Sequence, residues 1–182
     1  MLLDEAIKGR RSIRSFQDKT VPLEIVREVI EAGIWAPSTK NEQPWRFTVL
    51  TGESKDGFIT FFRSNLEVLS KKIGLAQMGS SFESCRVMEA APVLIIVWNA
   101  GRHGWLSEEH SVAAAIQNML IKAYSLGLGS LWIADVHCLR EEIVRYFSKT
   151  WGLTAAVAIG WPSSKPKPRQ RVSVDEVSEF LS

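Results

Sequence analysis

Residues 92–98, Pro-Val-Leu-Ile-Ile-Val-Trp, form the most apolar stretch of the chain and decide its fold. A continuous run of β-branched and aliphatic residues is typical of a strand that is covered on both faces. The run is also far shorter than the roughly 20 apolar residues that a membrane-spanning helix needs. The sequence therefore predicts a central strand with helices on both sides of its sheet, and no membrane anchor.

Shorter apolar segments on either side of this strand complete the expected sheet. Residues 45–50 alternate well enough to be a strand, and residues 131–134 and 154–159 are typical of two further buried strands. Between these two, a helix is expected from the spacing of Leu139, Ile143, Val144 and Phe147. The GRHG sequence at 101–104 is expected to be a loop.

The remaining apolar spacing is helical. It predicts a short helix over 2–8 that ends at Gly9, a second helix from 20–22 to 35–37, and the clearest helix over 111–126, closed by Gly127. A capping box of Ser173 and Glu176 predicts a last helical turn.

The middle of the chain is harder to interpret. Thr51 and Gly52 are expected to form a turn, and residues 53–88 are expected to be helical around 61–73, with breaks at Gly74 and Gly79. The sequence assigns no function to this part.

These elements predict an α+β fold with one layer of sheet and substantial helical cover. The chain has 182 residues, of which 46% are hydrophobic and 23% are charged, values that are typical of one folded domain and exclude a disordered chain. We therefore expect a single domain over 1–182.

Charge and cysteine content indicate the expected surroundings. A net charge of +2 is too balanced for a nucleic-acid-binding surface, so no nucleic-acid partner is expected. The two cysteines lie far apart in the sequence, and the chain starts with acidic rather than basic residues. Both features favour a reducing cytoplasm.

Several reaction classes lack their sequence motif. The three histidines have no metal-ligand spacing, and the chain contains no CxxC, HExxH, GxxxxGK[ST] or GxSxG sequence. The one GxG, at Gly127 and Gly129, follows a helix rather than a strand and lacks a third glycine. We expect no metal site, no phosphoryl transfer of the P-loop kind and no hydrolase nucleophile.

Two basic clusters are the remaining candidates for a binding site. They are RRSIR at 10–14 and KPKPRQR at 165–171. Arginine together with serine can hold a phosphate dianion by charge-assisted hydrogen bonds, so the two clusters could clamp one phosphate. Taken alone, each cluster could equally be a solvated surface run.

Four segments resolve this choice by their resemblance to a known family. Residues 10–16 (RRSIRSF), 36–47 (APSTKNEQPWRF), 115–132 (AIQNMLIKAYSLGLGSLW) and 158–171 (AIGWPSSKPKPRQR) resemble the nitroreductase family of FMN-dependent oxidoreductases in sequence, order and spacing. The resemblance covers most of the chain and is weakest over 53–88. It implies a single-domain fold whose central sheet is mixed, mainly antiparallel and flanked by helices.

The resemblance implies residues that contact FMN. The implied phosphate contacts are Arg10, Arg11 (mainly through its backbone), Ser12, Arg169 and Arg171. Arg14 would point to the pyrimidine end of the flavin, where a positive charge stabilises the anionic reduced ring. Arg86 falls where some relatives carry a lysine near the same edge, and either arginine could instead lie on the surface.

Further implied contacts come from three segments. A second subunit would supply Pro37, Ser38, Thr39, Asn41 and Gln43. The segment of Trp132, Ile133 and Ala134 would run beside the flavin ring, and Gly160 would allow close backbone approach to the cofactor. The alternatives are an ordinary polar turn at 37–43 and a core position for Trp132.

The resemblance also implies the activity. It predicts a homodimer, with the C-terminal segment exchanged between subunits, that binds FMN tightly and passes electrons from NADH or NADPH to a small-molecule acceptor such as a nitroaromatic or a quinone in a ping-pong cycle. No catalytic side chain is expected, because the cofactor carries the chemistry. Three alternatives remain: a specialised member of the fold that fragments flavin or removes halogen, a flavin-storage protein with little turnover, and an interaction domain whose basic clusters bind another anion.

Overall fold

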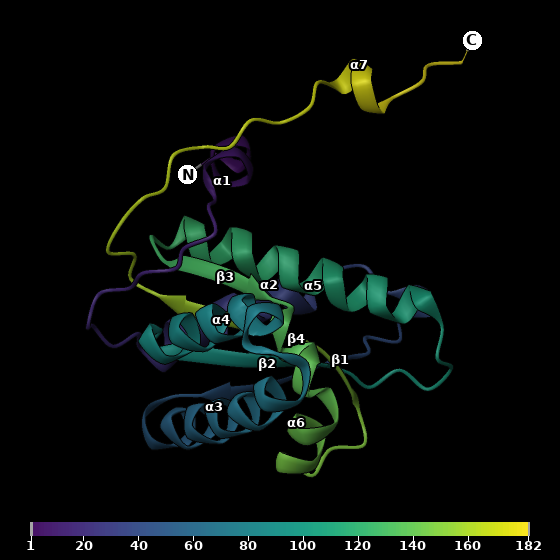
Figure 1. Ribbon diagram of the computed structural model, residues 1–182. Coiled ribbons are helices and arrows are strands. Elements are labelled where there is room, and N and C mark those ends of the chain that lie inside the picture. Colours follow the sequence, from purple (N-terminus) through teal and green to yellow (C-terminus); the bar gives the residue numbers. More distant parts are fainter. Residues whose placement is uncertain (1, 182) are drawn as a thin grey trace.

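A four-stranded antiparallel sheet forms the centre of the structure, a computed structural model that describes residues 2–181 (Figure 1). Its strands are β1 (Trp45–Leu50), β2 (Val93–Asn99), β4 (Gly152–Gly160) and β3 (Gly129–Ile133), in that spatial order. β2 pairs with β1 on one side and with β4 on the other. The predicted central strand is therefore confirmed.

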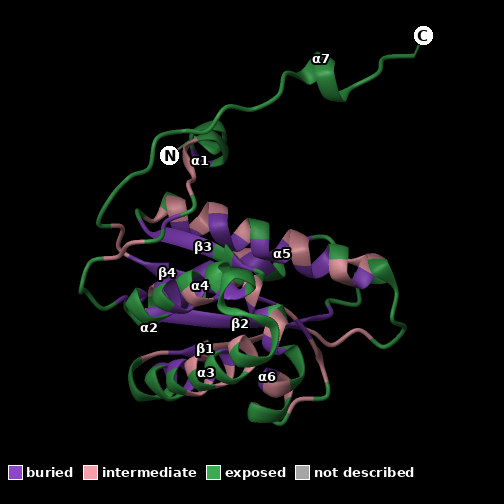
Figure 2. Cartoon of the chain, in the orientation of Figure 1, coloured by how far each residue is buried: buried purple, intermediate pink, exposed green. Residues whose placement is uncertain are grey.

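Helices cover both faces of the sheet, which explains why β2 is apolar from Val93 to Trp98, before its last residue Asn99. The side chains of Val93, Ile95 and Val97 pack with α2 (Leu23–Ile34) and α5 (Leu106–Ser125). The side chains of Leu94, Ile96 and Trp98 pack with the opposite layer, formed by α3 (Gly52–Ile73), α4 (Gly79–Ala90) and α6 (Arg140–Tyr146). Successive side chains of a strand point to opposite faces, so a strand between two helical layers needs an apolar residue at each position. Figure 2 shows the resulting buried interior.

The expected mixed sheet has a small parallel part. All four strands pair antiparallel, while Ser12 forms a single parallel bridge with Ser130 of β3. The backbone N–H of Ile13 donates to the Ser130 carbonyl at 3.0 Å. The segment that follows α1 (Leu3–Gly9) is thereby attached to the edge of the sheet.

Three expected boundaries in the helical layers are corrected. The turn at Thr51 and Gly52 is wrong, because Thr51 caps α3: its N–H donates to Ser54 Oγ at 3.2 Å. The break at Gly74 is confirmed by its φ of 95°, whereas Gly79 has helical dihedrals and begins α4. α5 begins at Leu106 rather than at Ser111, since the first turn contains a capping interaction of Glu108.

The chain leaves the sheet at the end of β4 and continues as an extended tail. The tail passes α1 and ends beyond α7 (Val174–Val177), and residues 163–181 are all exposed (Figures 1 and 2). The predicted capping box of α7 is present: Glu176 N–H donates to Ser173 Oγ at 3.3 Å, and Ser173 N–H donates to Glu176 Oε2 at 2.8 Å. Within residues 2–181, no helix combines the length and the hydropathy needed to cross a membrane.

Candidate functional site

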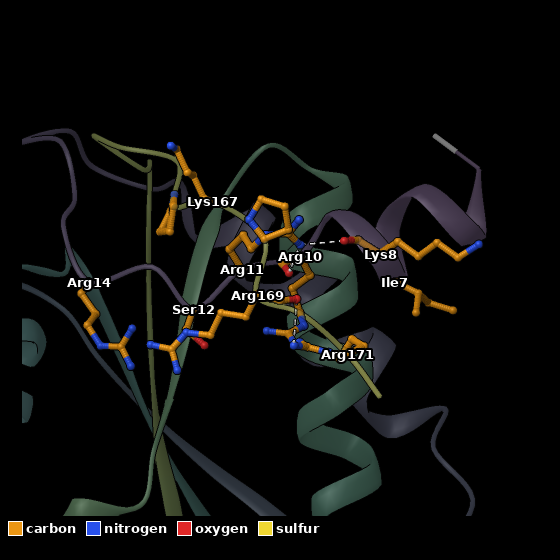
Figure 3. Close-up of a pocket in the computed structure, with 11 residues that line it drawn as sticks. Ile7, Lys8, Arg10, Arg11, Ser12, Arg14, Lys167, Arg169 and Arg171 are labelled. Carbon is orange, nitrogen blue, oxygen red and sulfur yellow. Dashed lines mark hydrogen bonds between the residues drawn. The ribbon is translucent and has the colours of Figure 1, made fainter. Parts of the chain in front are cut away.

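The two basic clusters meet at one cavity of about 540 Å³, although they are separated by some 150 residues of sequence. Figure 3 shows their side chains around it. The lining residues are Ile7, Lys8, Arg10, Arg11, Ser12, Arg14, Pro166, Lys167, Pro168, Arg169 and Arg171. All five of the predicted phosphate contacts, together with Arg14, are therefore in one place.

Close packing under the backbone holds the first cluster in position. Ile13 is 4% exposed and lies over Gly129 of β3, where a Cβ atom would come within 2.8 Å of the Ile13 side chain. Gly9, which ends α1, lies against the ring of Tyr124 in α5, so a larger residue would overlap that ring. With Ile13 turned inward, the side chains of Ser12 and Arg14 are exposed at the cavity.

The second cluster is placed by contacts at the start of the tail. The N–H of Gln17 donates to the Trp161 carbonyl at 2.8 Å, the N–H of Ser163 donates to the Ser15 carbonyl at 3.1 Å, and the Ser15 and Ser164 hydroxyls lie 2.8 Å apart. Pro166 and Pro168 then restrict the backbone of the segment that carries Lys167, Arg169 and Arg171 across the cavity.

The cavity is strongly positive. Seven of its lining residues are Lys or Arg, and none is acidic. Burial, followed by the charges of Arg171 and Arg11, lowers the pKa of Arg10 below its ordinary value. An anion in the cavity would remove this repulsion between like charges.

Two buried nitrogens also lack a partner. Arg10 Nε and Arg11 Nε make no hydrogen bond among the described residues. Unsatisfied buried donors cost free energy, and an anion is the group that satisfies a guanidinium best. The Nη1 of Arg11 turns back to the carbonyls of Lys8 and Arg10, at 2.6 and 2.9 Å, and so caps the end of α1. These two hydrogen bonds engage Nη1 of Arg11 with the backbone.

The predicted contacts at 37–43 lie away from this cavity. Thr39 N–H donates to Ser111 Oγ at 3.2 Å, and Gln43 N–H donates to Ser38 Oγ at 3.1 Å, so the segment packs on the first turns of α5. Pro37 and Asn41 are exposed. None of these residues lines the arginine cavity of the same chain.

The other predicted contacts are also outside the cavity. The Trp132 side chain is 37% exposed at the end of β3, which excludes the core position, while Ile133 is buried and Ala134 is exposed. At Gly160 a Cβ atom would overlap Pro92 and Phe16, so this glycine is needed for close protein packing.

Arg86 extends from α4 and pairs with Glu83 at 3.3 Å, with 72% of its side chain exposed. It lines a different cavity, together with Arg63 and Cys85.

Sequence reasoning missed Lys8, and it included Lys167 only as part of the second basic cluster, without naming it as a contact. Lys167 belongs to the second basic cluster, and its position between two prolines was a usable signal. Lys8 carried no signal, because a lysine in the last turn of a helix is common whatever the function.

Several known proteins with similar sequences and structures are described as nitroreductases. The model of the nitroreductase family matches residues 7–161. A chloronitrobenzene nitroreductase of Comamonas testosteroni is 41% identical, with 98% of this chain and 96% of that protein aligned. A Methanothermobacter thermautotrophicus protein assigned as an NADH dehydrogenase/NAD(P)H nitroreductase is 32% identical over 95% of this chain and 84% of that protein.

A solved structure extends the similarity to the fold. It is the crystal structure of a protein from Desulfovibrio desulfuricans, assigned as a nitroreductase and described in complex with FMN. The TM-score is 0.80 at 27% identity, and the match covers 100% of this chain and 98% of that one.

Proposed function

The chain belongs to the nitroreductase family, and from that premise we propose that it is an FMN-dependent oxidoreductase with NADH or NADPH as its reductant. The observation that carries the proposal is the meeting of residues 10–14 and 166–171 at one acid-free cavity. Family membership names FMN, and the cavity has the charge that its phosphate requires.

The residues present fit the phosphate end of FMN. Arg10, Ser12, Arg169 and Arg171 offer guanidinium and hydroxyl donors to a dianion, and the unpartnered Arg10 Nε is one donor that such a group would satisfy. Burial and then the charges of Arg171 and Arg11 lower the pKa of Arg10, and the same anion would offset the effect of those charges. These are the groups that would hold the cofactor tightly.

When bound, FMN supplies two-electron transfer from the reduced nicotinamide to a second substrate, in a ping-pong cycle. The side chains and backbone of the protein would bind and orient FMN. Arg14, exposed at the cavity, would place a positive charge at the pyrimidine end of the ring system. The backbone of Trp132, Ile133 and Ala134 would lie beside the ring, and no side chain is assigned a proton transfer.

The complete site is proposed to need two chains. Residues 37–43 lie outside the cavity of their own chain, where the family resemblance has them reach the flavin of a partner. The tail exposes apolar side chains, among them Val172 at 67% and Phe180 at 80%, as an arm exchanged between subunits would.

The acceptor is proposed to be a small molecule of the nitroaromatic or quinone class. The description of the Comamonas testosteroni relative names chloronitrobenzene, which supports the nitroaromatic class. Both cysteines are free thiols, which supports a reducing compartment such as the cytoplasm.

An anaerobic titration tests the proposal. Purified, FMN-supplemented protein is titrated with NADH and then with NADPH while the absorption band of oxidised flavin is followed. Loss of the band at near-stoichiometric nucleotide is expected. Bound flavin that stays oxidised with both nucleotides would instead indicate the storage role, and a protein that binds no flavin would exclude the proposed function.

A further inference from the structure

Three residues near the start of β1 have a backbone conformation that is uncommon outside glycine, although asparagine adopts it more readily than lysine or glutamine. Lys40, Asn41 and Gln43 have φ values of 50°, 56° and 49°, in the left-handed region that favours glycine. Such a conformation persists only where neighbouring groups hold it, and it is often found where a segment contacts a ligand. The segment 38–43 therefore needs a support.

The loop 101–105 provides contacts to this segment. His103 Nε2 lies 3.1 Å from Glu42 Oε1, and the ring N–H must be the donor because a carboxylate can only accept. Lys40 Nζ lies 4.7 Å from the centre of the Trp105 ring, a cation–π contact. The two contacts thus involve residues within the strained stretch.

The two aromatic residues of the loop form one rigid unit. The rings of His103 and Trp105 stack at 4.1 Å with an interplanar angle of 16°. A shift of either ring would therefore change both contacts to the segment 38–43.

Glu108 anchors the loop to the first turn of α5. Its side chain is buried, and its two oxygens accept the backbone N–H groups of His103 at 3.0 Å and Trp105 at 3.1 Å. These hydrogen bonds lower the pKa of Glu108, with the bond from His103 contributing most. Gly101 is required beside it, because any Cβ atom there would overlap the carboxylate.

The same residues bring three potential metal-ligand atoms within 4.8 Å of one another, from Glu42, His103 and Glu108. Both Glu108 oxygens, however, already accept backbone N–H groups. The cluster therefore has the structure of an anchor with satisfied hydrogen bonds rather than of an open ligand set.

We propose that His103 and Trp105 are positioning residues that hold segment 38–43 in the conformation that completes the flavin site of a partner subunit. The first half of this statement concerns the chain alone, and the second rests on the proposed function. Neither residue would touch the reacting atoms.

Amide hydrogen exchange in flavin-free protein tests the first half. In His103→Ala and in Trp105→Leu, exchange of residues 38–43 should be at least about 10-fold faster than in the wild type, as expected when a local support is lost. The matched control is His110→Ala, an exposed histidine on α5 outside this cluster. Unchanged exchange in both loop variants would overturn the proposal.

FMN binding and steady-state kinetics test the second half. Both loop variants should bind FMN about 10-fold more weakly, whereas His103→Gln, which keeps an N–H donor, should recover most of the affinity. With saturating FMN, kcat should return while the KM for the acceptor stays altered. Adding His103→Ala to Glu42→Ala should cause a smaller loss than His103→Ala causes in the wild type, because the His103–Glu42 contact is already absent.

The outcomes separate the two levels of the proposal. Faster exchange together with unchanged FMN affinity would overturn the role of His103 and Trp105 at the flavin site. If the wild-type protein binds no flavin, the proposed function is rejected. The exchange result then still decides whether the two residues support segment 38–43. If a chelator weakens FMN binding by the wild-type protein, Glu42, His103 and Glu108 bind a metal ion, and the role of Glu108 as an anchor is rejected.

Discussion

Arg10 combines the properties that a phosphate ligand needs. Its Nε is buried without a partner, and its neighbours Arg171 and Arg11 are also positive. A side chain in such a position gains free energy when an anion binds, because repulsion and an unmet hydrogen bond are removed together.

Replacement of the arginines tests this directly. Arg10→Ala and Arg171→Ala are each expected to weaken FMN binding by about 10- to 100-fold, the range for a lost charge-assisted hydrogen bond. The measurement is equilibrium titration of apoprotein by flavin fluorescence. Arg145→Ala is the control, since Arg145 pairs with Glu141 and Glu142 on α6 and does not line the cavity. If both cavity variants bind FMN with the wild-type affinity, Arg10 and Arg171 do not belong to the phosphate site.

Glu108 leads to a prediction about acid stability. Its pKa in the folded protein is lowered from the ordinary value of 4.5, so the carboxylate adds stability above that value and loses it as pH falls through the lowered folded-state pKa. Glu108→Gln should therefore melt at a lower temperature than the wild type at neutral pH, and the difference should shrink as the solution is acidified. Thermal unfolding across that pH series measures the effect. A constant difference at all pH values would contradict the assignment.

At single positions, the sequence predicted site residues where charged residues are clustered. It did not predict residues whose role depends on the backbone conformation around them. The arginines at 10, 14, 169 and 171 stand out by type and spacing. Glu108 does not, because its importance comes from backbone N–H groups of a loop whose conformation no sequence pattern specifies. Lys40 and Gln43 likewise gave no sign of a positive φ.

Among the elements, β3 determines the position of the first basic cluster, residues 10–14. Its first residue, Gly129, lies directly beneath Ile13, and the next, Ser130, bonds the same segment. The position of the arginine segment thus depends on how closely it can approach the strand.

Gly129→Ala tests this dependence. The added methyl group would lie within 2.8 Å of the Ile13 side chain, so the segment must move outward at a cost of about 1–3 kcal/mol in the free energy of unfolding. FMN affinity should fall together with stability. Urea unfolding and flavin titration measure the two effects. Gly79→Ala is the control, because Gly79 has helical dihedrals and no atom near its Cβ position.

The strands were predicted more accurately than the helices for a physical reason. The alternating β1 matches its expected range, and the apolar run of β2, which lies between two helical layers, gives its bounds to within one residue at each end. β3 and β4 each begin two residues before their expected ranges. The helices α3 and α5 begin at turns made by polar side chains, Ser54 and Glu108, whose contacts set the first residue. Apolar spacing does not report such contacts.

For the whole molecule, the cavity depends on chain topology. The isolated bridge between Phe16 and Pro162 brings the start of the tail beside the first basic cluster. Sequence analysis could predict that both clusters suit one phosphate, but their meeting follows from the path of the chain after β4. The family resemblance supplied this expectation, whereas composition and spacing did not.

Removal of the tail tests the proposed exchange between subunits. A chain that ends at residue 171 keeps every cavity residue and loses the exposed apolar side chains Val172, Val174, Val177, Phe180 and Leu181. If these pack on a partner, the shortened protein should shift from dimer to monomer at micromolar concentration, because most of the apolar surface of the arm is lost. Light scattering after size-exclusion chromatography measures the mass. An unchanged dimer would place the interface elsewhere.

The exposure of residues 165–171 also makes this segment accessible to proteases. Lys165 and Lys167 each precede a proline, and trypsin-like proteases do not readily cleave a Lys–Pro bond. Arg169 and Arg171 lie in the same exposed stretch and are not followed by proline. An anion that engages both arginines would draw this stretch against residues 10–14 and shield those two bonds. Anion binding in the cavity should therefore slow cleavage of the purified protein after Arg169 and Arg171.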